Sequence, residues 1–161
     1  EDKAAFLDRA RAAMLALLNE GDHVVASRFL FGNTVSMFGT LAGRGTPFTF
    51  VDATDVANVA AAITPATKAV FVETIANPRT QVADLAGIGE VCARHGLVYV
   101  VDNTMTSPWL FRPSTVGASL VVNALTKYIG GHGNALGGSV TGCMWPWPTL
   151  ISKCSRGRLL A

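Results

Sequence analysis

The sequence is organised around short, continuous apolar runs, each of which ends in or next to a polar residue. The clearest runs are HVVAS (23–27), KAVFVE (68–73), LVYVVD (97–102) and ASLVVNA (118–124). Segments rich in Ala and Leu separate them, with Gly or Pro at their ends. Apolar strands that alternate with helices are typical of a parallel sheet with both faces covered. We therefore predict an α/β fold with a mostly parallel sheet flanked by helices.

The remaining elements follow from periodicity and from Gly and Pro as breakers. We expect four helices, and two shorter strands, FTFV and GSVTG. The expected helices cover residues 4–18, 34–42, 55–63 and 83–95, and the shorter strands cover residues 48–51 and 138–142. No internal repeat and no linker is apparent, so we expect one domain or a piece of one.

Composition excludes several classes of protein. Half of the 161 residues are hydrophobic and 15% are charged, which argues against disorder. The net charge of +2 is small and scattered, so we expect no nucleic-acid partner. No apolar run is long enough to span a bilayer, and the first residues, EDKAAFLDRARAAML, do not resemble a signal peptide. We expect a cytoplasmic protein without a membrane partner.

The cysteines and histidines give no metal motif. Three cysteines occur, an odd number with no zinc-like spacing, and the three histidines lie far apart in the sequence. We interpret the cysteines as reduced thiols and expect no metal. The residues concerned are Cys92, Cys143, Cys154, His23, His95 and His132.

Polar side chains at the ends of the predicted strands mark the place where a ligand would bind. They are Ser27, Glu73, Asp102, Asn123 and, just beyond the last run, Lys127. In open parallel sheets, ligands bind beyond the carboxyl ends of the strands. We therefore expect a binding site at this edge.

Asp102 and Lys127 each allow two interpretations. Asp102 either forms a turn or helix cap in the sequence DNT, or is a buried carboxylate facing a cation. A lysine is usually a solvated surface charge. Lys127, however, lies between an apolar strand and a glycine-rich segment, which favours a desolvated site. Desolvation lowers the pKa of a lysine and frees its lone pair for attack on a carbonyl, as a Schiff-base lysine requires.

Three further features are weaker evidence for a ligand site when each is taken alone. The glycine-rich residues 130–138 do not form the fingerprint of a dinucleotide site, and we interpret them as an irregular path beside a cofactor. Phe31, next to Gly32, either stacks on a planar ligand or belongs to the core. Asn77 either bonds a ring substituent or belongs to an ordinary Asn-Pro turn.

Taken together, the segments resemble the Cys/Met-metabolism family of pyridoxal-phosphate enzymes, the transsulfuration enzymes. The motifs that carry the resemblance occur in order between residues 18 and 142: NEGDHVVAS, LFGNT, VFVETIANP, VYVVDNTMTSPWLFRP and GASLVVNALTKYIGGHGNALGG. The resemblance implies the large cofactor domain of fold-type I pyridoxal-phosphate enzymes.

The resemblance also assigns roles to five residues. Lys127 matches the lysine that holds pyridoxal 5'-phosphate covalently and later moves the substrate α-proton. Asp102 matches the carboxylate that keeps the pyridine nitrogen protonated, so that the ring draws electrons. Phe31 matches the aromatic residue that stacks on the ring, Asn77 a residue near the ring hydroxyl, and Thr126 a hydroxyl that contacts the phosphate.

Many members of the family carry tyrosine where this chain has Phe31. With phenylalanine at this position, the chain resembles the O-succinylhomoserine and O-acetylhomoserine sulfhydrylases. The resemblance implies a γ-replacement on an activated homoserine ester. Cystathionine γ-synthase, cystathionine lyase and methionine γ-lyase activities remain alternatives. Ala124 replaces the serine usual in the family, so one phosphate contact is missing.

The two ends depart from the family pattern. DRARAAML lacks the glycine of the family's phosphate-binding segment, and residues 143–161 no longer resemble the family. We therefore expect a truncated chain with a partial cofactor domain over residues 1–142 and a divergent tail over 143–161. A catalytically inactive remnant is a second hypothesis, and an unrelated nucleotide-binding module a third. The family implies an amino-acid substrate and a homo-oligomer, a tetramer of dimer pairs.

Overall fold

A six-stranded sheet in the order β2-β1-β3-β4-β5-β6 forms the centre of the molecule. The computed structural model describes residues 4–142. The first five strands are parallel, and β6 runs antiparallel to β5. The prediction of a mostly parallel sheet is confirmed. The strands are β1 (His23–Ser27), β2 (Phe48–Val51), β3 (Thr67–Glu73), β4 (Val98–Asp102), β5 (Leu120–Ala124) and β6 (Gly138–Gly142).

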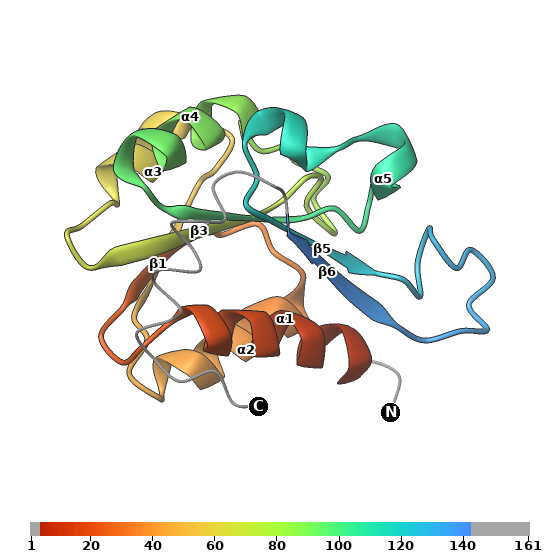
Figure 1. Ribbon diagram of the computed structural model, residues 1–161. Coiled ribbons are helices and arrows are strands. Elements are labelled where there is room, and N and C mark those ends of the chain that lie inside the picture. Colours follow the sequence, from red (N-terminus) through yellow and green to blue (C-terminus); the bar gives the residue numbers. More distant parts are fainter. Residues whose placement is uncertain (1–3, 143–161) are drawn as a thin grey trace.

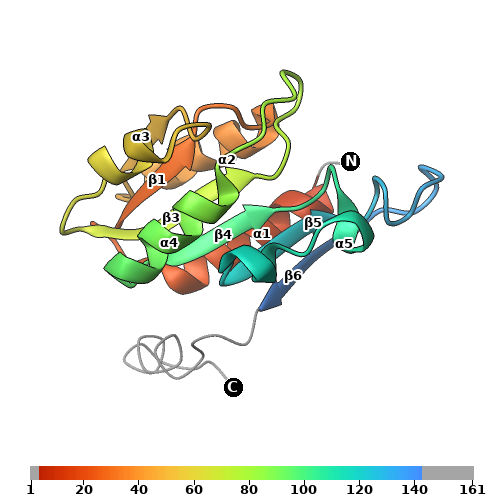
Figure 2. The same ribbon diagram turned by 90° about the horizontal axis from the view of Figure 1, so that it is seen from above.

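Helices cover both faces of the sheet, as predicted. Helices α1 (Ala4–Leu17) and α2 (Gly32–Ala42) lie on one face, and α3 (Val56–Ala61) and α4 (Leu85–His95) lie on the other (Figures 1 and 2). Two short helices within residues 107–116 were not predicted. They are α5 (Ser107–Leu110) and the 3₁₀ helix η1 (Pro113–Val116), each with a proline in its first turn, and they are too short to show a periodic pattern.

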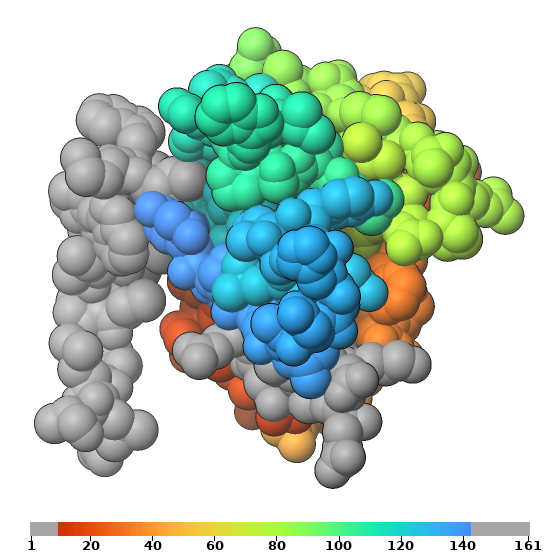
Figure 3. Space-filling view, turned by 90° about the vertical axis from the view of Figure 1, so that its right-hand side faces the viewer, coloured from red at the N-terminus to blue at the C-terminus, as the bar shows by residue number. Residues whose placement is uncertain are grey.

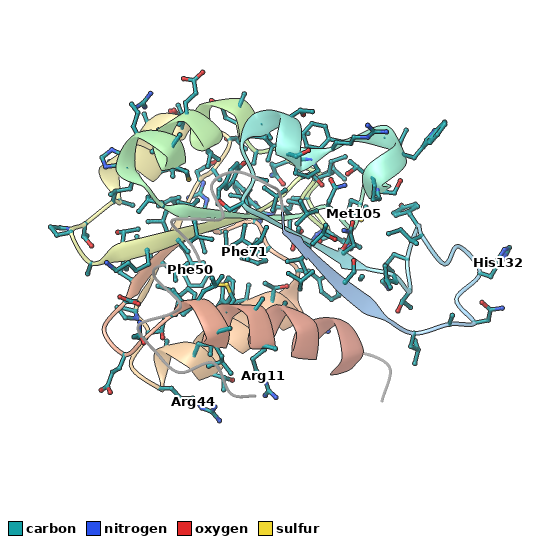
Figure 4. The ribbon with its side chains drawn as sticks, viewed as in Figure 1. Arg11, Arg44, Phe50, Phe71, Met105 and His132 are labelled. Atoms are coloured by element: carbon teal, nitrogen blue, oxygen red, sulfur yellow. The ribbon has the colours of Figure 1, made fainter. Side chains whose placement is uncertain are left out.

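The alternation of side chains along the strands produces two separate cores. In β3, Ala69 and Phe71 join the core under α1 and α2, whereas Val70 and Val72 join the core under α3 and α4. Figure 4 shows Phe71 on the α1 and α2 side of the sheet. Because both faces are buried, all four residues of this run must be apolar, which explains the continuous pattern in the sequence.

The order of the strands reverses between β1 and β3. The chain leaves β1 for β2 through α2 on one face and returns to β3 through α3 on the other. The loops that follow β1 and β3 therefore lead to opposite faces and leave a crevice between them, which is where α/β sheets bind ligands. A cavity of about 570 Å³ opens there, lined by residues 28–30 and 76–79.

Within residues 4–142, no helix is long and apolar enough to cross a membrane, and no group of His, Cys, Asp and Glu side chains could hold a metal ion. Cys92 is a buried free thiol. Cys143, Cys154 and the expected tail over 143–161 lie outside the described residues.

The closest approach between α4 and η1 depends on Gly89. A Cβ atom at this position would overlap the backbone carbonyl oxygen of Val116. We predict that Gly89→Ala lowers the free energy of unfolding by about 3 kcal/mol, because two backbones would have to separate. Urea unfolding followed by circular dichroism measures this.

Gly39 in α2 is the matched control, because a Cβ there meets nothing within 4 Å. We expect Gly39→Ala to stabilise the protein by about 0.5–1 kcal/mol, the usual gain for alanine in a helix. Equal unfolding curves for Gly89→Ala and wild type would show that α4 and η1 do not pack as described.

Candidate active site

Buried polar side chains gather at the carboxyl edge of the sheet, as predicted. Ser27, Glu73 and Asp102 are the last residues of β1, β3 and β4, and Asn123 is the penultimate residue of β5. All four are buried. Figure 3 looks onto this edge, with the segments that follow β1 in orange, β3 in lime, β4 in teal and β5 in blue.

Asp102 is both a turn-former and a buried carboxylate. Its Oδ1 atom accepts hydrogen bonds from the Thr104 N–H at 2.9 Å and the Thr104 hydroxyl at 2.6 Å. Burial raises the pKa of Asp102 to about 6, and the bonds from Thr104 act in the opposite direction. Within the described chain no basic side chain pairs with it. The site therefore holds a buried anion that lacks a cation.

Thr104 ties Asp102 to the strand that leads to Lys127. The Ala124 N–H donates to the Thr104 hydroxyl oxygen at 2.8 Å, while that hydroxyl donates to Asp102. The end of β5 is thus fixed relative to the carboxylate. This role of Thr104 was not predicted from the sequence. The signal was the spacing of Asp102 and Thr104 in DNT, which is that of a side-chain-capped turn.

Glu73 lies beside Asp102, because the register of β3 and β4 pairs the two residues directly. Its two carboxylate oxygens accept from two loops: Oε1 from the Phe31 N–H at 2.7 Å and Oε2 from the Asn77 N–H at 3.3 Å. The pKa of Glu73 is raised to about 7, chiefly by burial and in addition by the negative charge of Asp102, while the two N–H donors oppose the rise. The sequence placed Glu73 at this edge without a role.

Phe31 and Asn77 are brought together through Glu73. Phe31 is the N-cap of α2 and is 43% exposed, so the alternative of a core phenylalanine is wrong. Asn77 is half-buried and lines the 570 Å³ cavity. That cavity includes none of the other predicted site residues, Asp102, Thr126 and Lys127 among them. The cavity thus marks the crevice beside Asn77, not the whole site.

The expectation that Lys127 lies in a desolvated site is wrong. Its side chain is exposed, so the predicted desolvated environment is not present in this chain. The reason is the path of residues 125–137, which leave the end of β5 and project away from the sheet before β6 begins (Figure 1). His132 is near the tip of that projection (Figure 4). The Gly131 N–H bonds the Lys127 carbonyl oxygen at 2.8 Å and closes a turn around the lysine.

Thr126 helps to hold this projecting segment. Its hydroxyl oxygen accepts from the Gly137 N–H at 3.1 Å, which leaves the hydroxyl proton available for another acceptor. Gly131 and Gly133 have φ angles of 77° and 67°, values that residues other than glycine rarely adopt. The irregular backbone path expected for the glycines is therefore confirmed, and its place beside a cofactor stays a prediction.

Comparison with protein families shows which family the chain belongs to. Residues 8–154 match the model of the family described as Cys/Met metabolism PLP-dependent enzyme, where PLP is pyridoxal phosphate. The chain belongs to this family. The match extends past both ends of the motif series at 18–142. The members of this family are pyridoxal-phosphate-dependent lyases and transferases of the transsulfuration type.

Curated relatives with different activities are similar to the chain to nearly the same degree. A probable cystathionine gamma-synthase of Herpetosiphon aurantiacus is 39% identical over 81% of this chain and 41% of its own length. A cystathionine gamma-lyase of Bacillus subtilis is 38% identical over 81% of this chain and 35% of its own. An O-acetyl-L-homoserine sulfhydrylase of Leptospira meyeri is 41% identical over 80% of this chain and 30% of its own length. The chain therefore spans 30–41% of these relatives.

A solved structure has the same fold. The cystathionine gamma-lyase of Lactobacillus plantarum, complexed with L-serine, superposes with a TM-score of 0.86 and 33% identity. The superposition covers 95% of this chain and 39% of the other. The expected likeness to the fold of these enzymes is confirmed, and the chain corresponds to a part of it.

The residues at the carboxyl edge fit the family's cofactor. Asp102 supplies a buried anion, and no described residue offers it a cation, as a site for a protonated pyridine nitrogen requires. Phe31 presents an exposed ring on a loop that is tied to the neighbouring strand. Lys127 follows β5 by three residues and carries an accessible amine. The assignment of roles to these side chains stays a prediction.

The raised pKa of Asp102 makes the cofactor-free fold sensitive to pH. A carboxyl group whose pKa rises on folding, here from 3.8 to about 6, stabilises the fold below its unfolded pKa and loses that contribution as pH rises. We predict that the free energy of unfolding falls between pH 4 and pH 8, with about 2 kcal/mol of the fall due to Asp102. Urea titrations at pH 4 and pH 8 measure this fall, and Asp102→Asn should show a smaller fall than wild type by that amount.

Asp55→Asn is the control, since Asp55 is an exposed helix N-cap that asparagine replaces well. Its unfolding curves should keep the wild-type dependence on pH. If Asp102→Asn also keeps the full dependence, the carboxylate is not buried in the way described.

Proposed function

We propose that this protein is a pyridoxal-phosphate-dependent enzyme whose cofactor binds at the carboxyl edge of β3, β4 and β5. The observation that carries the proposal is the buried, cation-free carboxylate of Asp102 at the end of β4. Lys127 would hold the cofactor covalently, Asp102 would pair with the ring nitrogen, and Phe31 would stack on the ring. Asn77 would approach the ring hydroxyl and Thr126 the phosphate.

When bound, pyridoxal phosphate supplies an electron-poor ring that accepts the electrons left by removal of a substrate α-proton. The protein's part is electrostatic and positional. Asp102 favours the protonated ring nitrogen, because its buried negative charge is most stable beside a positive one. Lys127 would hold the cofactor through its side-chain amine, and that amine, when free, could take and return a proton. Thr104 keeps the Asp102 carboxylate aimed by two hydrogen bonds.

For the substrate we propose an activated homoserine ester in a γ-replacement by a thiol or sulfide, as in O-succinylhomoserine sulfhydrylases. Phe31 is the residue that favours it, because many family members have a phenol there. The relatives above include a gamma-synthase, a gamma-lyase and a sulfhydrylase at 38–41% identity, so similarity alone does not separate these activities. Incubation with O-succinylhomoserine and sulfide, read as homocysteine formed, distinguishes the proposal from cystathionine cleavage, which releases a keto acid.

A second candidate function is that of an inactive remnant that keeps the fold. The exposure of Lys127 favours it, because the amine is not held in a desolvated site. Ala124, in place of the family serine, removes one hydroxyl near the phosphate. Location of the protein in the cytoplasm is part of either proposal.

A prediction on Lys127 separates the two candidates. We expect the purified chain with added pyridoxal phosphate to show a visible absorbance band, and borohydride to fix the cofactor on the peptide that contains Lys127. Lys127→Ala should lose both signals completely, because no other lysine of the described residues lies at the end of β5.

Lys68→Ala is the matched control, since Lys68 is an exposed lysine in β3 near the opposite edge of the sheet. It should keep the band and the fixed peptide. A fixed adduct of equal yield in Lys127→Ala would refute the assignment. No band in folded wild type would favour the remnant.

We also propose that the protein works as a homo-oligomer, an assembly of dimer pairs. The support is an exposed apolar pair on α5, beside the carboxyl edge: Trp109 is 91% exposed and Leu110 is 76% exposed. Large apolar side chains in such positions are typical of interfaces between subunits.

We predict that the double substitution Trp109→Ser and Leu110→Ser shifts the protein to smaller species in sedimentation velocity, with unchanged far-ultraviolet circular dichroism. Leu15→Ser on the outer surface of α1, in the opposite layer, is the control and should sediment as wild type does. Identical sedimentation of the α5 variant and wild type would exclude this surface.

A further inference from the structure

One carboxylate joins the two loops that flank the crevice. The loop after β1 carries Phe31 and the loop after β3 carries Asn77, and these loops lead to opposite faces of the sheet. Glu73 bonds the backbone N–H of both residues, one with each oxygen, at 2.7 and 3.3 Å. Among the described residues, no other side chain bonds both of these loops.

We propose that Glu73 is a positioning residue that sets the spacing of Phe31 and Asn77 around the pyridine ring. This inference rests on the proposed function, in which both residues approach that ring. Glu73 acts through the backbone of its two partners and need not touch the ring itself. Its loss would let the stacking residue and the residue near the ring hydroxyl move independently.

The chemistry of the side chain supports this role. An ionised carboxylate offers two equivalent acceptor oxygens and no donor, which suits two N–H groups that converge from different loops. Glutamine has the same shape but only one acceptor oxygen. Its amide NH₂ would have to face one of the two N–H donors, so Glu73→Gln can satisfy one loop only.

The position of Glu73 also argues for a role beyond the sheet. The residue is buried directly beside Asp102, which is an unfavourable place for a second carboxylate. A small space next to it is lined by Ser27, Phe29, Thr54 and Gln81, among others, and by no further ionisable side chain. Arg28, the nearest cation in the loop after β1, instead pairs with Asp52 at 2.8 Å. Asp102 is therefore the charged group that acts on Glu73.

The first test uses the cofactor-free chain. Amide proton shifts in NMR report hydrogen bonds to a titrating carboxylate. We expect the Phe31 and Asn77 amides to move between pH 5 and pH 9 with one shared midpoint, because one group accepts from both. Glu73→Gln should remove this shared titration. Amides that do not titrate, or that titrate with separate midpoints, would overturn the proposal.

The second test measures binding of pyridoxal phosphate by absorbance titration at pH 8. Glu73→Gln should raise the dissociation constant roughly tenfold, the effect of one lost charge-assisted hydrogen bond. Circular dichroism of the bound cofactor should weaken as well, because the stacked ring is no longer fixed. Glu90→Gln, at an exposed glutamate on α4, is the control and should bind as wild type does.

The outcomes separate this inference from the proposed function. If wild type does not bind pyridoxal phosphate, the proposed function fails, and the NMR test still decides whether Glu73 joins the loops. If wild type binds and Glu73→Gln binds within twofold of it, the positioning role is refuted while the proposed function stands. Should the variant fail to fold, the pH titration of wild-type amides remains decisive.

Discussion

The parallel pairing of β3 with β4 is the constraint on which the candidate site depends. Its register places Glu73 directly opposite Asp102, so two carboxylates end adjacent strands on the same face of the sheet. Phe71 and Val100, two positions earlier on the same face of these strands, belong to the core under α1 and α2. A slip of either strand by one residue would turn its acid to the opposite face and put an apolar side chain at the site. The core and the site are thus fixed by one register.

The two acids then perform different tasks because their surroundings differ. Asp102 receives hydrogen bonds on one oxygen from its own turn, at Thr104, and has no basic partner within the described part of the chain. Glu73 uses both oxygens for backbone N–H groups of neighbouring loops. One carboxylate is therefore available to a cation from outside, while the other is occupied in holding the protein together. Identical chemical groups acquire separate functions through their hydrogen-bond partners.

Much of this arrangement could be predicted from the sequence. The apolar runs fixed the strands to within two residues, because a strand buried on both faces leaves no room for polar side chains. The placement of Asp102 at a strand end followed from the same pattern. The exposure of Lys127 could not be predicted, since it depends on the path of residues 125–137 in space. Glu73 was seen as a strand-end acid, but its partners come from loops 42 and 4 residues away, and no local pattern records such contacts.

The buried acids also couple binding to the stability of the fold. In the cofactor-free chain, burial raises the pKa of Asp102 and of Glu73, so ionising either group near neutral pH opposes folding. A cation bound beside Asp102 would pair with the buried negative charge and so offset the cost of burying it. Because such a cation binds only the folded state, it stabilises that state. Such a ligand would therefore stabilise the sheet most where Asp102 is ionised, above its raised pKa. A carboxylate that weakens the empty fold is, by the same electrostatics, the group that makes the folded chain bind a protonated ring.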